Sequence, residues 1–263
     1  MMKYLPLIWT TLRRATPLKL LDAYRIARYG KTWYEPEGQP VRKVFSEIYL
    51  RGLWGDEKDG SPFYSGPGSE AGVSGPYVQA VKQFIEANGI RSIVDVGCGD
   101  FRVGSRLVGP SLSYHGVDVV GDLIRYNSEK FSSAHVVFYC RDVTVDALPA
   151  GDLCLIRQVL QHLSNDQVAR VLARCEQYPY VIVTEHLPSP TKAWTPNLDI
   201  HHGNETRVGY ESGLLLDQPP FDRAVERVLC EVPLPDQTVL STVLLVNKPR
   251  EESPRLQPWG GFV

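Results

Sequence analysis

The sequence predicts an α/β fold in which a mostly parallel sheet of seven strands ends in an antiparallel last strand. Five short apolar runs rich in β-branched residues recur between residues 92 and 185, with helical patterns between them. A glycine turn follows the first run, where an open α/β sheet places its ligand site. Two further runs near the end of the chain have no helix between them, which is typical of an antiparallel pair.

The elements of this sheet follow one another from residue 77 onward. A helix from Tyr77 to Asn88 is expected to end at Gly89, because glycine readily terminates helices. Ser164 and Gln167 have the spacing of a capping box, which predicts a helix to about residue 175. The strands are expected at residues 92–96, 114–120, 136–140, 152–156 and 180–185, and the antiparallel pair at residues 224–232 and 241–248. Since the first five runs are apolar on both faces, they are expected to be parallel and covered by helices.

The chain ahead of the sheet is expected to form an N-terminal extension. We place it at residues 1–75, the sheet domain at residues 76–250 and a C-terminal tail at residues 251–263. Residues 1–33 combine a helical pattern with seven Lys or Arg and one acidic residue, a charge of about +6 against −8 for the rest. Two interpretations stay open: a helix that binds an anionic membrane or an acidic partner, and a helix packed on its own domain with a solvated basic face.

Residues 34–75 have a composition of their own. They are too rich in glycine for one regular element and too aromatic for a disordered linker, so we expect an ordered loop that folds over something. Trp54, Tyr64 and Ser65 are its candidate lid and substrate-contacting residues, because aromatic faces stack on sugar rings or cover a bound cofactor.

The bulk composition excludes several classes of protein. A net charge of −2 argues against general nucleic-acid binding, and no apolar run reaches the ~18 residues of a membrane-spanning helix. The five cysteines are scattered and form no C-x-x-C pair, which indicates core residues in a reducing compartment. We therefore expect a cytoplasmic protein, with contact at the inner face of the membrane left open by residues 1–33. The sequence does not determine the oligomeric state.

The turn Gly97-Cys98-Gly99 is the first candidate ligand site. A turn with almost no side chains lets the backbone approach a ligand closely. Asp118 ends the second strand 19 residues beyond Gly99, the spacing at which a carboxylate holds the two hydroxyls of a ribose. Asp95 and Asp100 flank the turn and would repel a pyrophosphate, but they suit a ligand with ammonium and sulfonium centres. These features together indicate S-adenosylmethionine as the cofactor.

Four segments carry a resemblance to a known family: "VDVGCGD" (94–100), "GVDVV" (116–120), "CRDV" (140–143) and "DLCLIRQVLQHLS" (152–164). Over roughly residues 76–248 the chain resembles the class I S-adenosylmethionine-dependent methyltransferases, whose Rossmann-like fold also ends in an antiparallel strand. Within that family it looks most like a bacterial small-molecule or glycan-type subgroup. The residues that match this subgroup are Trp54-Gly55, Ser65 to Ser69, Asn204, Arg207 and Pro219 to Phe221.

The resemblance implies a role for each matching residue. Gly97 and Gly99 would admit the methionine moiety, and Asp95 or Asp100 would face its ammonium group. Asp118 would hold the ribose hydroxyls. Three residues would surround adenine, and two would line the floor beside the methyl donor: Val119, Asp142 and Val143, then Arg157 and Gln158. Turn and cap chemistry is the alternative for Asp95 and Asp142.

The acceptor side is less determined. A histidine titrates near neutrality and suits general-base work, so His162 after the fourth strand and His186 after the fifth are the candidate catalytic residues. His162 serves equally well as a loop-orienting residue, and His186 as a surface histidine. Asp199, His201 and His202 are close enough in sequence to help ligate a divalent ion, although we expect no metal, because polar loops often contain histidine by chance.

The leading hypothesis is an enzyme that methylates a hydroxyl of a sugar, a glycan or another small polar metabolite. The N/D-P-P-Y/F sequence of amide and adenine N-methylation is absent after the fourth strand, where the chain reads "IRQVL". Three alternatives stay open: an N-methyltransferase of a small molecule, a catalytically silent fold that binds a partner through residues 1–33, and a nucleotide-sugar or NAD(P)-linked oxidoreductase.

Overall fold

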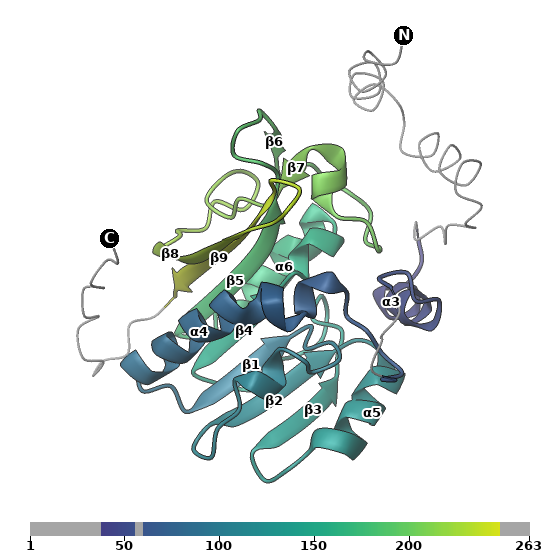
Figure 1. Ribbon diagram of the computed structural model, residues 1–263, viewed down its shortest axis with the longest axis vertical. Coiled ribbons are helices and arrows are strands. Elements are labelled where there is room, and N and C mark those ends of the chain that lie inside the picture. Colours follow the sequence, from purple (N-terminus) through teal and green to yellow (C-terminus); the bar gives the residue numbers. More distant parts are fainter. Residues whose placement is uncertain (1–37, 56–59, 248–263) are drawn as a thin grey trace. The chain divides into compact units, whose positions relative to one another are not determined.

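The computed structural model describes residues 38–55 and 60–247, and its centre is a seven-stranded sheet with helices on both faces (Figure 1). The strand order is β3-β2-β1-β4-β5-β9-β8, in which β9 runs antiparallel to both of its neighbours and the other pairs are parallel. The strands are β1 (Ser92–Val96), β2 (Ser113–Asp118), β3 (Val136–Cys140), β4 (Leu153–Arg157), β5 (Tyr180–Leu187), β8 (Arg227–Pro233) and β9 (Val239–Val246). The predicted fold class is confirmed, and every predicted strand end lies within three residues of the observed one.

The core lies on both sides of this sheet because the central strands are apolar on both faces. Helix α4 (Ala71–Ala87) and helix α5 (Gly121–Phe131) share one apolar cluster with the sheet, in which Phe84 packs against Tyr180. Neighbouring residues of a strand point to opposite faces. Cys154 therefore points to the other face, where its sulfur lies 3.7 Å from that of Cys175 at the end of α6 (Asn165–Cys175). The five cysteines are free thiols; Cys98, Cys154 and Cys175 are buried, and Cys140 and Cys230 are partly exposed.

Helix α6 begins as the sequence predicts. The Ser164 hydroxyl accepts a hydrogen bond from the Gln167 backbone, and the Gln167 side chain accepts one from the Ser164 backbone. Helix α4 begins at Ala71, six residues before the predicted start at Tyr77. The prediction failed there because proline usually opens a helix, whereas Pro76 lies inside α4.

The expectation that residues 34–75 contain no regular element is wrong. Helix α3 (Val41–Leu50) lies within them, and its buried Val44, Phe45 and Ile48 form one apolar face. Among the described residues, those from Pro40 on form one compact unit, so α3 and the aromatic loop belong with the sheet, although the sequence predicted them to be part of the N-terminal extension. Short elements complete the fold: the 3₁₀ turns η1 (Pro67–Ser69), η2 (Gly104–Arg106), η3 (Leu160–His162) and η4 (Arg207–Tyr210), and the paired β6 (Thr195–Pro196) and β7 (Ser212–Gly213).

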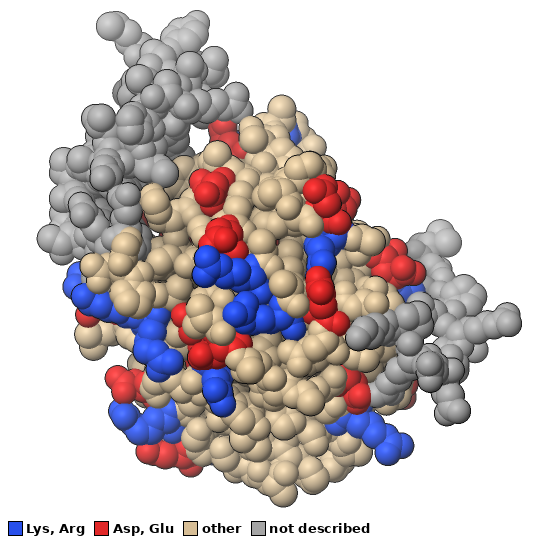
Figure 2. All heavy atoms as spheres, turned by 180° about the vertical axis from the view of Figure 1, so that it is seen from behind, with Lys and Arg blue, Asp and Glu red and all other residues tan. Residues whose placement is uncertain are grey.

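Two predictions fall outside the described residues: the basic helix within residues 1–33 and the tail at residues 251–263. Within the described ranges no helix is both long enough and apolar enough to cross a bilayer. The face drawn in Figure 2 intersperses acidic and basic side chains and shows no continuous field of either sign. Exposed ion pairs such as Arg170–Asp166 on α6 and Arg125–Asp122 on α5 also bring opposite charges together.

Candidate active site

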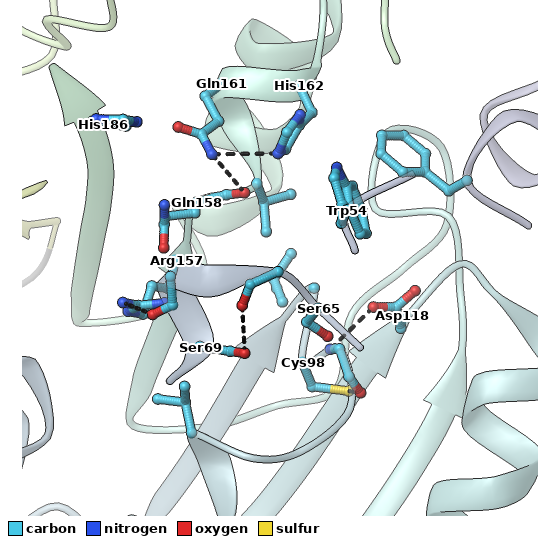
Figure 3. A pocket seen from close by; sticks show the side chains of 18 of the residues that line it. Trp54, Ser65, Ser69, Cys98, Asp118, Arg157, Gln158, Gln161, His162 and His186 are labelled. Carbon is cyan, nitrogen blue, oxygen red and sulfur yellow. Dashed lines mark hydrogen bonds between the residues drawn. The ribbon is translucent and has the colours of Figure 1, made fainter. Parts of the chain in front are cut away.

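A cavity of about 550 Å³ lies at the carboxyl ends of β1, β2, β4 and β5, the edge at which an open α/β sheet binds its ligands (Figure 3). Its other walls come from α3, the loop through Ser65 and the turn between β8 and β9. The predicted site residues that line it are Trp54, Ser65, Asp95, Gly97, Gly99, Asp100, Asp118, Val119, Asp142, Val143, Arg157, Gln158, His162 and His186. Tyr64 is not among the lining residues, and its hydroxyl donates to Glu70 at 2.8 Å.

The glycine turn is shaped by the chain itself. Gly97 and Gly99 have φ angles of +71° and +55°, which favour glycine. A Cβ on Gly97 would lie 2.3 Å from Cγ2 of Val159, and one on Gly99 would lie 2.3 Å from Oγ of Ser65. The sequence predicted close approach by a ligand, but the atoms against these two Cα positions belong to Val159 and Ser65.

Asp118 joins the end of β2 to this turn. Its Oδ2 accepts from the Gly99 backbone at 3.2 Å, and its Oδ1 accepts from the Val120 backbone at 3.0 Å. Burial raises the pKa of Asp118, and the backbone donors oppose that rise. Each carboxylate oxygen has more than one lone pair, so the residue can still accept from a ligand that enters the cavity.

Asp95 is a second carboxylate of the cavity, and it is buried. Its Oδ2 accepts a short hydrogen bond from the Tyr114 hydroxyl. Burial raises the pKa of Asp95 to about 6, although the Tyr114 hydrogen bond and the positive charge of Arg157 both favour the ionised form. Burial thus makes the ionised forms of Asp95 and Asp118 costly, and a cationic ligand would stabilise both.

Both carboxylate oxygens of Asp100 accept hydrogen bonds from the backbone. Its Oδ2 accepts from the Ser65 backbone at 3.1 Å, and its Oδ1 accepts from the Arg102 backbone at 3.2 Å. Asp142 similarly holds its own turn, because its Oδ1 accepts from both the backbone and the hydroxyl of Thr144. The turn chemistry that the sequence left open for Asp142 is therefore present, in a residue that also lines the cavity.

The segment after β4 forms the cavity floor. Arg157 donates to the Gly68 carbonyl at 2.7 Å, and its guanidinium lies 5.2 Å from the centre of the Tyr77 ring. Gln158 has a φ angle of +56°, and its side-chain oxygen would lie 2.1 Å from a Cβ on Gly68. Arg157 and Gln158 thereby fix the position of the loop that contains Gly68.

Glu185 and Arg207 hold the next turn, η3, in place. The backbones of Leu160 and Gln161 each donate to the buried Glu185 carboxylate at 3.0 Å. Burial raises the pKa of Glu185 to about 8, against the effect of these donors and of Arg207. Arg207 is 1% exposed and donates to the carbonyls of Leu160 and Leu163. No functional role was predicted for Glu185, and Arg207 was named only as part of the subgroup resemblance.

The two candidate histidines lie on different walls. His162 is buried, its Nδ1 lies 3.1 Å from the Glu205 carbonyl, and its ring lies 5.3 Å from that of Trp54. Burial lowers the pKa of His162 to about 4. His186 is half-buried at the end of β5 and bonds to Thr238 through Nε2 at 2.6 Å. Figure 3 shows it on the far side of Arg157 and Gln158 from Cys98 and Asp118.

Three lining residues carry buried polar atoms that have no hydrogen-bond partner in the described part of the chain. They are Nε1 of Trp54, Nε of Arg157 and Oε1 of Gln161. A buried polar atom without a partner is costly, so two donors and one acceptor in one cavity indicate a polar ligand. The sequence did not identify Gln161 as a site residue.

Two residues of the candidate metal loop bind the start of α6. Asp199 accepts from the Asn165 backbone at 2.7 Å, and Nδ1 of His202 lies 3.0 Å from the Gln167 amide nitrogen. Both contacts support the start of α6. Residues 38–55 and 60–247 contain no group of three or more His, Cys, Asp or Glu side chains that could hold a metal ion.

Comparison with solved structures identifies the fold. The magnesium protoporphyrin IX methyltransferase ChlM from Synechocystis PCC 6803, with bound S-adenosylmethionine, matches at a TM-score of 0.51 and 12% identity over 80% of this chain and 99% of that one. The N-methyltransferase NodS from Bradyrhizobium japonicum WM9, in complex with S-adenosyl-L-homocysteine, matches at a TM-score of 0.53 and 14% identity, over 78% of this chain and 100% of that one. TnmH matches at a TM-score of 0.51 and 19% identity, over 90% of this chain and 69% of that one. The sequence matches no protein-family model and no curated protein. The chain therefore has the Rossmann-like fold of the class I methyltransferases.

Proposed function

We propose that this protein is an S-adenosylmethionine-dependent methyltransferase that methylates a hydroxyl group on a sugar, a glycan or another small polar metabolite. The observation that carries the proposal is the pair of carboxylates at the strand ends beside the glycine turn, the buried Asp95 and the partly buried Asp118. Negative charge in a buried cavity favours a cationic nucleoside over a phosphate-bearing one. Bound S-adenosylmethionine would supply a methyl group activated by its sulfonium charge.

The residues of the cavity fit this cofactor. Asp118 would accept from the ribose hydroxyls with the lone pairs that Gly99 and Val120 leave available. Asp95 would face the ammonium group, and it is better suited to that role than Asp100, whose oxygens accept from Ser65 and Arg102. Val119, Asp142 and Val143 lie together along the cavity wall where adenine would follow the ribose.

The other half of the cavity would receive the acceptor. Trp54 Nε1 would donate to it and Gln161 Oε1 would accept from it, which would give both buried atoms a partner. Trp54 also presents an aromatic face, which suits contact with a sugar ring. Of the two histidines, His186 is the better candidate for the general base, because the pKa of His162, lowered to about 4, makes it a weak proton acceptor at neutral pH.

The walls of the cavity would also limit the access of water. Phe45 and Tyr49 of α3 line the cavity with Trp54, whose ring contacts both of theirs. Exclusion of water strengthens the electrostatic interactions within a site and protects a reactive cofactor. Contact of residues 1–33 with an anionic membrane surface remains a prediction.

Transfer of a radioactive methyl group tests the proposed activity. The purified protein is incubated with methyl-labelled S-adenosylmethionine and a panel of monosaccharides, glycosides, phenols and amines. We expect label in a hydroxylated acceptor, loss of transfer in Asp95→Asn, and unchanged transfer in the exposed control Asp122→Asn. Label in amines alone would show an N-methyltransferase. Cofactor binding without transfer to any fraction of a cell extract would show a silent binding fold.

A further inference from the structure

The turn between β8 and β9 places a carboxylate and a hydroxyl behind His186. Thr238 is buried just before β9, and its hydroxyl donates to Oδ1 of the exposed Asp236. The same hydroxyl lies 2.6 Å from Nε2 of His186. Asp236 and His186 both line the cavity, whereas Thr238 lies behind them.

The contacts among Asp236, Thr238 and His186 determine which atoms carry the protons. A threonine hydroxyl has a single proton, and Thr238 uses it in the hydrogen bond that it donates to Asp236. Thr238 can then only accept from His186, so Nε2 of His186 carries the proton. A neutral imidazole has one protonated nitrogen, which leaves Nδ1 of His186 with its lone pair.

We propose that Asp236 and Thr238 are positioning residues that hold His186 in the tautomer whose Nδ1 accepts the proton of the methyl acceptor. The inference rests on the proposed function and deepens it. As the acceptor hydroxyl oxygen bonds to the methyl carbon, its proton passes to Nδ1, and the electron pair of the broken carbon–sulfur bond stays on sulfur. The resulting imidazolium keeps its Nε2 proton on Thr238, so Asp236 stabilises the charge through one intervening hydroxyl.

The other charged groups near His186 have partners of their own. Glu185 precedes it in β5, points to the opposite face of the strand and accepts from the backbones of Leu160 and Gln161. Arg157 in the neighbouring β4 donates to the Gly68 carbonyl. The strand partner of His186 in β9 is the apolar Leu240. Asp236 is therefore the group whose charge acts on this histidine, and it supports the charged form against burial.

Nuclear magnetic resonance of the full chain labelled with ¹⁵N-histidine tests this assignment without an acceptor. His186 is identified by the signal that His186→Gln removes. We expect the Nε2-protonated tautomer in the unmodified protein. In Asp236→Asn and Thr238→Val, we expect the pKa of His186 to fall by about 0.5, an amount limited by the exposure of Asp236. Thr238→Ser keeps the hydroxyl and should retain the original titration.

The matched control is Thr242→Val, which removes a buried hydroxyl from the adjoining strand β9, where it contacts Thr184 and not His186. With an acceptor from the transfer assay, Thr238→Val should lower kcat about tenfold with KM unchanged, and Thr238→Ser should restore it. A protonated Nδ1 in the unmodified protein would overturn the proposal. Identical titrations of His186 in Thr238→Val and Thr242→Val would also overturn it, because they would show that Thr238 only supports the turn. Cofactor binding in Thr238→Val should equal that of the unmodified protein, so absence of binding in both would instead reject the proposed function.

Discussion

Ser65 and Asp100 exchange two hydrogen bonds although they lie 35 positions apart in the chain. The Ser65 backbone donates to Oδ2 of Asp100 at 3.1 Å, and the Asp100 backbone donates to Oγ of Ser65 at 2.8 Å. Tyr49 of α3 reaches the same hydroxyl at 2.8 Å. The aromatic loop is therefore attached to the end of the glycine turn, and α3 is attached to the loop through the same serine hydroxyl.

Substitution of Ser65 by alanine should weaken cofactor binding with little loss of stability. The variant loses the side-chain contacts to Asp100 and Tyr49 but keeps the Ser65 backbone donor. Loss of about 1 kcal/mol of loop attachment corresponds to roughly a fivefold rise in Kd. Calorimetric titration with S-adenosylmethionine measures it, with the exposed Ser105→Ala as control. Equal affinities in the two variants would show that the loop does not close this part of the cavity.

Gly97→Ala should destabilise the protein for two separable reasons. A φ angle of +71° costs a residue with a Cβ about 1–2 kcal/mol, and the overlap with Val159 adds about 1–3 kcal/mol. Denaturant unfolding of Gly97→Ala, Val159→Ala and the double variant separates the two. In the Gly97→Ala background, Val159→Ala should restore the free energy lost to the overlap but not the free energy lost to the backbone conformation. Strict additivity of the two substitutions would mean that Val159 does not limit this position.

Asp118→Asn should reduce affinity for S-adenosylmethionine by about a hundredfold, because the amide presents a donor to ribose hydroxyls that need an acceptor. One of the Gly99 and Val120 backbone donors would also face that amide, so we expect a loss of about 1–3 kcal/mol in unfolding free energy. Calorimetry and thermal unfolding are measured on the same sample, beside the exposed Asp122→Asn. Unchanged affinity in a folded Asp118→Asn would refute the ribose assignment.

His162 should make the protein sensitive to acid. Its pKa is about 4 in the folded chain and 6.5 in the unfolded chain, so between these values the unfolded state binds more protons. Stability therefore falls as the pH drops from 6.5 to 4, by about 3 kcal/mol at most. Unfolding free energies of His162→Asn across this range should show a shallower decline. The control His135→Asn, at an exposed position, should show the same pH dependence of stability as the unmodified protein. If His162→Asn also shows it, His162 is not the source of the acid sensitivity.

The sheet was predictable because its signals are local. Runs such as Ile93 to Val96 and Leu153 to Ile156 are apolar at every position except Asp95, and only a strand buried on both faces accounts for so short a run. The capping box at Ser164 likewise lies within four residues of sequence. Helix α3 was missed although Val44, Phe45 and Ile48 have helical spacing, because the glycine-rich segment that follows dominated the composition of residues 34–75.

The site was predictable only in part, since its contacts are long-range. The sequence placed Asp95, Asp118 and the glycines at strand ends that converge, and these residues do line one cavity. It could not show that Asp100 would be engaged by Ser65, or that Glu185 and Arg207 would hold the turn through Leu160. Nor could it place Thr238 behind His186, because that contact joins residues 52 positions apart.

The central claim is that this cavity selects a cationic sulfur nucleoside, and paired calorimetric titrations test it most directly. One titration uses S-adenosylmethionine, and the other uses NAD⁺ under the same buffer and salt conditions. The account predicts saturable one-to-one binding of S-adenosylmethionine at micromolar concentrations, weakened in Asp95→Asn and Asp118→Asn, with no heat from NAD⁺. Saturable binding of NAD⁺ with no heat from S-adenosylmethionine would contradict it.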